Sequence, residues 1–308
     1  MPRKRTRKPD SETVEIRTSD GWSLRADVDE PEGQPVGVAV LAHAMMARRS
    51  SFDRPKGQGV RRMLAGRGWR VVTFDFRGHG DSGPSASEGG RWGYDELVRG
   101  DMPAVLAFAR SREKKKRPVV LVGHSLGAHV GLAAQGAGLA CFDAIVSVAG
   151  NVWMREHEPS MLRWAIKRAS MAAAAETCRR VGRFPARRLR MGSDDEARHY
   201  FEDLDRFVGT GRWSSTDGEH DYLAQLGRVR IPVAQIVSDG DRLACVPECG
   251  ARFLDLCRGP RELVRVERSD DGGEPPGHMD IVTGGRIGSV WQRVEAWMRA
   301  VVVAPRAF

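Results

Sequence analysis

Long hydrophobic runs are missing from the 308-residue sequence, although 41% of its residues are hydrophobic. No segment approaches the roughly 18 apolar residues of a membrane-spanning helix, so we expect no membrane span. The first nine residues, MPRKRTRKP, carry charge without an apolar stretch, so they lack the pattern of a secretory signal. These absences predict a cytoplasmic protein with a disordered basic tail over residues 1–12.

Cysteine is scarce, with five residues in the chain. Without a secretory signal, free thiols in a reducing compartment are the expectation. Cys245 and Cys249 have C-x3-C spacing, but no paired His or Cys motif completes a zinc site. We therefore expect neither a metal nor a cofactor.

Acidic residues are outnumbered by basic ones, 40 against 49, which gives a formal net charge of +9. Such a balance can attract nucleic acid or acidic lipid. No nucleic-acid-binding motif accompanies the charge, so it indicates a solvated basic surface. The expected partner is a small molecule rather than nucleic acid, and the oligomeric state is left open.

Apolar runs alternate with segments of helical periodicity along most of the chain. The pattern predicts a hairpin over residues 13–28 and later strands at 36–42, 69–74, 119–122, 144–149, 233–237 and 262–266. Helices are expected at 57–65, 97–109, 248–256 and 289–300, and directly after residue 125. This alternation predicts an α/β fold with a mostly parallel central sheet and helices on both faces.

Strand patterns are lacking between residues 151 and 228. A helix is expected over residues 161–180, and SDDE at 193–196 predicts a capping box at the start of an amphipathic helix. We therefore expect a helical insertion at 151–228, between core segments 13–150 and 229–308.

The sequence GHSLG occupies residues 123–127, between a buried-strand pattern and a helical one. Gly-x-Ser-x-Gly in this setting is typical of a nucleophile elbow, which predicts Ser125 as a nucleophile. Serine is a weak nucleophile at neutral pH, so it needs a base and an acid that orients the base.

Two further loops leave predicted strands and carry suitable side chains. Asp239 and Asp241 follow the strand at 233–237, and His278 follows the strand at 262–266. The order Ser, Asp, His is that of the α/β-hydrolase triad, with His278 as base and Asp241 as its orienting acid. Alternatively, the two aspartates only form turns and His278 is only exposed. Their joint occurrence on strand-exit loops favours the triad.

Acyl chemistry also needs donors for an oxyanion. The backbone amide of Leu126 is one candidate, at the start of the helix after Ser125. The second is the backbone amide of Met45, in the loop after the strand at 36–42.

The sequence resembles α/β-hydrolases, in particular the serine aminopeptidase and lysophospholipase-like group of predicted esterases. The resemblance runs from residue 13 to nearly the end, on HAM at 43–45, FDFRGHGDS at 74–82, GHSLG at 123–127, DRL at 241–243 and GHM at 277–279. It favours Asp241 over Asp239, because the family acid precedes a short apolar segment ending in proline, here residues 243–247. Two departures are HAMM in place of the commoner HGxxG, and Asp280 as a nearby alternative partner for His278.

The resemblance also implies that the insertion is a cap, where members of the family differ most. Five of its aromatic residues either line an acyl pocket or pack the cap onto the core: Trp153, Trp164, Phe184, Tyr200 and Phe201. We expect Trp153, Trp164 and Tyr200 to contact substrate.

Three functions fit these features. The first is a serine hydrolase that cleaves a carboxylic ester through an acyl-enzyme. The second is a thioesterase or acyltransferase whose basic insertion binds an acidic carrier such as coenzyme A, through Arg179, Arg180, Arg183, Arg187 and Arg188. The third is a non-catalytic binding protein, which the complete triad argues against. Serine rather than aspartate at position 125 argues against an epoxide or haloalkane hydrolase.

Overall fold

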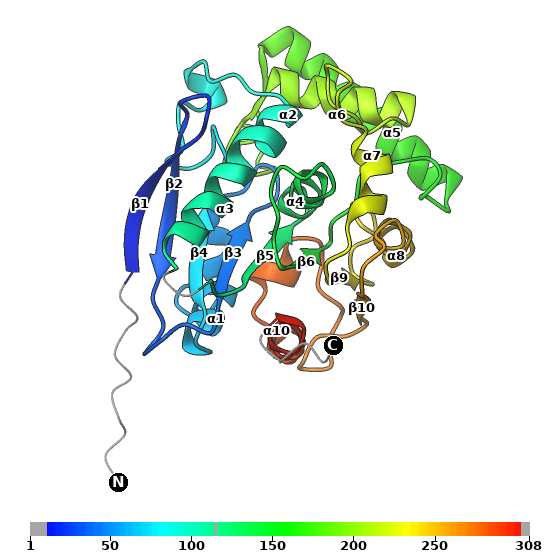
Figure 1. Ribbon diagram of the computed structural model, residues 1–308. Coiled ribbons are helices and arrows are strands. Elements are labelled where there is room, and N and C mark those ends of the chain that lie inside the picture. The colour runs from blue at the N-terminus through cyan, green and yellow to red at the C-terminus, as the bar shows by residue number, and fades with distance from the viewer. Residues whose placement is uncertain (1–10, 114–115, 303–308) are drawn as a thin grey trace.

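An eight-stranded sheet forms the centre of the computed structural model, which describes residues 11–113 and 116–302 (Figure 1). The strand order is β1-β2-β4-β3-β5-β6-β9-β10. The strands are β1 (Ser11–Arg17), β2 (Ser23–Asp29), β3 (Val38–Ala42), β4 (Arg70–Phe74), β5 (Val119–His124), β6 (Ala144–Val148), β9 (Val233–Ser238) and β10 (Arg261–Val266). The hairpin β1–β2 pairs antiparallel with β4, and the remaining strands are parallel. The predicted mostly parallel α/β fold is confirmed.

The central strands β3, β5, β6 and β9 are buried at every residue. Their near-continuous apolar sequences follow from this, since both faces of each strand are covered. The pairing register aligns their carboxyl ends: Ala42 of β3 lies opposite Gly123 of β5, and His124 lies opposite Val148 of β6. The loops that leave β3, β5 and β6 therefore meet at one edge of the sheet.

Two helical layers cover the sheet. α3 (Met102–Ser111), α4 (Leu126–Gly136) and α8 (Pro247–Leu254) share an apolar cluster with one face. α1 (Val60–Gly66), α9 (Asp280–Thr283) and α10 (Gly288–Val302) share a second cluster with the other face. A π-helical turn, η3 (Leu97–Asp101), precedes α3 where one continuous helix was expected.

The insertion (residues 151–228) contributes α5 (Met161–Val181), α6 (Arg198–Thr210), α7 (Tyr222–Gln225) and η4 (Leu226–Arg228). Figure 1 shows α5 and α6 side by side beyond α3 and α4. The expectation that this segment lacks strands was wrong, because Arg183–Phe184 and Glu196–Ala197 form a short antiparallel pair, β7 and β8. Local periodicity does not reveal two-residue strands.

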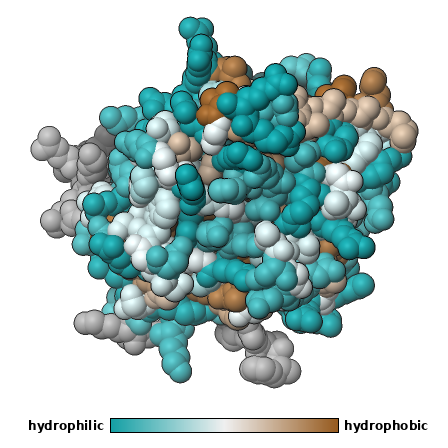
Figure 2. Space-filling view, turned by 90° about the horizontal axis from the view of Figure 1, so that it is seen from above, coloured by the Kyte–Doolittle hydropathy of each residue, from teal (hydrophilic) through white to brown (hydrophobic). Residues whose placement is uncertain are grey.

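The insertion also carries most of the exposed large hydrophobic side chains among the described residues. Six of their nine exposed large hydrophobic side chains belong to it: Met161, Leu162, Ile166, Val181, Leu189 and Met191. In Figure 2, apolar side chains collect mainly toward one margin of an otherwise largely hydrophilic face. No helix between residues 11 and 302, leaving aside 114–115, combines the length and apolarity of a membrane span.

The predicted tail falls mostly outside the described residues. The structural description begins at Ser11, which together with Glu12 belongs to β1. The expected disordered segment therefore extended two residues too far, because these residues pair with Asp29 and Val28 of β2.

Candidate active site

Ser125 lies between the end of β5 and the start of α4, with φ 50° and ψ −106°. A positive φ is unfavourable for a residue with a side chain, and such strain concentrates at functional turns. A Cβ atom on Gly123 would approach the Ala128 nitrogen to 2.5 Å, and one on Gly127 would approach the Ala42 oxygen to 2.2 Å. The two flanking glycines are thus required by close backbone approach, as a nucleophile elbow demands.

The structure brings His278 and Asp241 together, although they lie 37 residues apart. The His278 Nδ1 atom is 2.5 Å from the Asp241 Oδ2 atom. Asp241 also accepts hydrogen bonds from the backbone amides of Ala244 and Cys245, each at 2.9 Å. Burial works against ionisation of Asp241, but the His278 contact and the backbone amides of Cys245 and Leu243 hold the pKa of the carboxyl below its usual value.

The two competing aspartates lie elsewhere. The Asp239 carboxylate accepts a hydrogen bond of 2.7 Å from Arg265. Asp280 is the first residue of α9, and its carboxylate makes no hydrogen bond with His278. Asp241 is thus the carboxylate in contact with the His278 ring.

His124 supports the His278 loop, which sequence reasoning did not anticipate. Its Nε2 lies 3.0 Å from the backbone oxygen of His278, and the two ring centroids are 5.2 Å apart. Burial lowers the pKa of His124 to about 3, so the ring is neutral and its Nε2–H donates to that oxygen. The signal lay in the elbow sequence itself, which places a histidine directly before Ser125.

The backbone amides of Met45 and Leu126, the two predicted oxyanion donors, belong to the loop after β3 and to the first residue of α4. Within residues 11–113 and 116–302, neither amide has a hydrogen-bond acceptor from the protein. The neighbouring amide of Met46 is already engaged, at 2.6 Å from the Glu196 carboxylate. His43 steadies the same loop, because its Nδ1 lies 2.7 Å from the Ala44 oxygen and its Nε2 accepts the Phe76 amide at 3.0 Å.

Residues 193–196 contact this loop instead of capping a helix. α6 begins at Arg198 without a side-chain cap, so the predicted capping box was wrong. The Ser193 amide donates to the Met46 oxygen at 2.7 Å, and the Glu196 carboxylate holds the Met46 amide. The tertiary contacts of Glu196 prevailed over the local capping preference.

His79 completes this connection from the core side. It is fully buried, its Nδ1 lies 3.0 Å from the Arg77 oxygen, and its Nε2 lies 2.9 Å from Glu196 Oε1. Both ring nitrogens face acceptors, which requires an imidazolium. Burial opposes this charge, but Glu196 raises the pKa of His79 to about 9. A buried ion pair therefore joins the insertion to the Arg-Gly-His-Gly turn after β4.

This pair predicts a pH-dependent contribution to stability. Because the pKa of His79 is raised from 6.5 to about 9, the contribution is complete below pH 6.5 and is lost as the pH rises through about 9. The loss is at most about 1.4 kcal/mol per pH unit. The titratable groups facing His79 are Glu196, Asp194 and His43.

Urea unfolding of the wild type and of His79→Asn at several pH values tests this contribution. The difference in their free energies of unfolding should shrink as the solution becomes alkaline. A difference that is independent of pH would contradict the ion pair.

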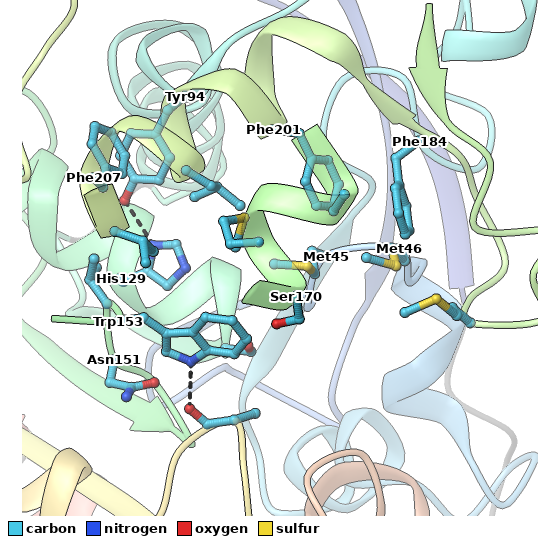
Figure 3. A pocket seen from close by; sticks show the side chains of 18 of the residues that line it. Met45, Met46, Tyr94, His129, Asn151, Trp153, Ser170, Phe184, Phe201 and Phe207 are labelled. Atoms are coloured by element: carbon cyan, nitrogen blue, oxygen red, sulfur yellow. Dashed lines mark hydrogen bonds between the residues drawn. The ribbon is translucent and has the colours of Figure 1, made fainter. Parts of the chain in front are cut away.

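A cavity of about 490 Å³ lies beneath the insertion, and Ser125 and His278 both line it. Its walls are mainly apolar, with Met45 and Met46 from the loop after β3, and Phe184, Phe201 and Phe207 from the insertion. Figure 3 shows Tyr94, His129 and Phe207 grouped at one end in this view, and Phe184 with Met46 at the other.

Three of the five aromatic candidates in the insertion line this cavity: Trp153, Phe184 and Phe201. Trp153 is fixed by a hydrogen bond of 2.9 Å from its Nε1–H to the Ala244 oxygen. Trp164 and Tyr200 do not line it; Trp164 packs against the main apolar cluster and Tyr200 is fully buried within it. Periodicity placed Tyr200 on the apolar face of its helix and Trp164 within a helix, but it could not separate cavity from core.

The described residues contain no cluster of three or more His, Cys, Asp or Glu side chains able to hold a metal ion. All five cysteines, including Cys245 and Cys249, are free thiols.

Comparison with known proteins gives a family match over most of the chain. The model of the alpha/beta hydrolase family matches residues 39–285. No curated protein matches the sequence.

Solved structures share the fold at low sequence identity. The esterase domain of a Rhodothermus marinus protein is 20% identical, with a TM-score of 0.59 over 95% of this chain and 99% of that one. A Pyrococcus furiosus esterase is 17% identical, with a TM-score of 0.60 over 96% and 94%. A thermophilic esterase from Thermogutta terrifontis is 15% identical, with a TM-score of 0.61 over 94% and 99%. With the strand order, the elbow at Ser125 and the family match in agreement, the chain belongs to the alpha/beta hydrolase family.

Proposed function

We propose that this protein is a serine hydrolase that cleaves carboxylic esters through an acyl-enzyme. The observation that carries the proposal is the 2.5 Å contact between His278 Nδ1 and Asp241, on a ring that lines the same cavity as Ser125. With Nδ1 engaged by the carboxylate, Nε2 is the nitrogen left for the serine.

In the first half-reaction, the Ser125 hydroxyl oxygen bonds to the ester carbonyl carbon while His278 Nε2 takes the hydroxyl proton. The carbonyl electron pair moves onto oxygen, where the Met45 and Leu126 amides donate hydrogen bonds. Collapse of this intermediate breaks the bond to the alcohol oxygen, which receives the proton from His278. Water then repeats the sequence and releases the acid.

A panel of p-nitrophenyl esters of increasing acyl length, run beside acyl-coenzyme A thioesters, tests the proposal. Turnover of the esters, with weaker turnover of the thioesters, is the expected result. Turnover confined to the thioesters would favour the thioesterase alternative. A protein that turns over neither series and is not labelled by a fluorophosphonate would be a binding protein.

Only two of the five arginines expected to bind an acidic carrier are left without a salt bridge to the described residues, so the insertion gives limited support for such a carrier. Arg179, Arg180 and Arg183 already contact carboxylates within the chain, on Glu176 and Asp195. Arg187 and Arg188 make no salt bridge with the described residues. We therefore prefer oxygen esters.

We further propose that the insertion is a cap that selects the acyl chain. Phe201 lines the cavity while its neighbour Tyr200 does not, and both side chains are buried on α6. Phe201→Ala should favour longer acyl chains by about tenfold in relative kcat/KM, because it lengthens the apolar pocket.

Tyr200→Ala is the matched control. Each substitution should cost about 3–5 kcal/mol of stability, but only the cavity residue should change the ranking across the ester panel. Equal rankings in both variants and the wild type would remove the role of the insertion in specificity.

A further inference from the structure

His129 is a buried polar side chain that the proposed chemistry does not use. It lies on α4 one helical turn beyond Ser125, and its amide donates to the Ser125 oxygen at 3.2 Å. One such turn displaces it by about 6 Å along the helix axis. It is 5% exposed and lines the cavity that contains Ser125.

One nitrogen of the His129 ring is fixed by Tyr94. The Tyr94 hydroxyl oxygen lies 2.8 Å from His129 Nδ1, and the two rings stack with centroids 5.6 Å apart. Trp213 packs edge-on against both rings, at 6.2 Å from Tyr94 and 6.3 Å from His129. The imidazole is therefore held in one orientation before any ligand binds.

The other nitrogen, Nε2, has no hydrogen-bond partner among the described residues. Figure 3 shows it on the side of the ring that faces the cavity, away from Tyr94. Burial lowers the pKa of His129 to about 3, so the ring is neutral and carries one N–H. The Tyr94 hydroxyl has no other acceptor in the described part of the chain, so it donates to Nδ1 and leaves the proton on Nε2.

We propose that His129 selects esters whose acyl chain carries a hydrogen-bond acceptor, such as an oxo group, about one helical turn from the scissile carbonyl. This inference rests on the proposed ester hydrolysis. The leaving alcohol must lie close to His278, which returns its proton, so we assign the acyl chain to the walls of the cavity that include His129 and Phe201. A purely apolar chain would displace water from Nε2–H and leave a buried donor unpaired, whereas an oxo chain would satisfy it.

Two matched substrates test this proposal: the p-nitrophenyl esters of 5-oxohexanoic acid and 5-methylhexanoic acid, which differ by oxygen against methyl. The readout is the ratio of their kcat/KM values, because general damage to the site lowers both rates. His129→Leu should reduce the oxo-to-methyl ratio about tenfold, the worth of one buried hydrogen bond. His129→Gln, which keeps an N–H donor, should retain most of the ratio. Met171→Leu, an apolar change in the same cavity, should leave the ratio within about twofold.

If the oxo-to-methyl ratio of kcat/KM is the same in His129→Leu, His129→Gln and the wild type, the role of His129 is overturned. The proposal of ester hydrolysis is unaffected by that result. If the wild type hydrolyses neither ester, the proposed function fails instead. Calorimetric titration of the same pair into Ser125→Ala, alone and combined with His129→Leu, then decides the His129 question. We expect Ser125→Ala to bind the oxo ester more tightly than the methyl ester, and this difference to disappear when His129→Leu is added. Equal Kd values for the two esters in Ser125→Ala would refute the proposal.

Discussion

Ser125→Ala should abolish fluorophosphonate labelling and lower kcat for ester hydrolysis by about 10⁶-fold, the scale seen when a triad nucleophile is removed. The expectation rests on the backbone of Ser125, which is held at φ 50° between β5 and α4. Alanine can adopt the same conformation at a similar cost, so the fold should persist. Circular dichroism melting would verify this.

Ser147 is a useful comparison for the labelling experiment. Its hydroxyl is buried and has no hydrogen-bond partner within the described residues, but it lies within β6 and does not line the cavity. Ser147→Ala should therefore label like the wild type. Undiminished labelling of Ser125→Ala would mean that another residue is the nucleophile.

Asp241→Asn should lower kcat by about 10⁴-fold, because an amide can present its N–H₂ group to Nδ1 and favour the wrong imidazole tautomer. The substitution is nearly isosteric, and the Ala244 amide, which donates to Oδ1, can still donate to the remaining oxygen, whereas the Cys245 amide, which donates to Oδ2, then faces the N–H₂ group. The loss should therefore fall on kcat rather than on KM, and steady-state kinetics on one short ester measures it.

Asp239→Asn and Asp280→Asn are the controls for this assignment. Asp239 contacts Arg265 at the surface and Asp280 begins α9, so each change should alter kcat by no more than a few-fold. A severe effect of Asp280→Asn together with a mild effect of Asp241→Asn would transfer the orienting role to Asp280.

The sheet and its loops were predictable because the apolar signal there is strong. Strands such as β5 and β9 are buried along their whole length, so their sequences read as continuous apolar runs. The carboxyl ends of parallel strands lie at one edge, so a serine, an aspartate and a histidine on strand-exit loops were expected to converge. The contact between His278 and Asp241 agrees with that reasoning.

The role of Glu196 was not predictable from local sequence. Its partners, His79 and Met46, lie 117 and 150 residues away, and a serine three positions earlier supplied a plausible capping motif. Only the folded chain shows that the carboxylate is buried between the insertion and the core. The same limit applies to Tyr200 and Phe201, which are adjacent aromatic residues on one helix with different surroundings.

The Glu196 contacts have a consequence for building chimeras within the family. A donor insertion grafted between residues 150 and 229 would bring its own pocket walls but would replace the carboxylate that holds the Met46 amide and pairs with His79. The recipient would then keep a buried imidazole without its counter-ion, beside a loop without its anchor. A chimera that takes its specificity from a relative would therefore have to keep residues 193–197 of this chain, because they belong functionally with the core that carries Ser125 and His278.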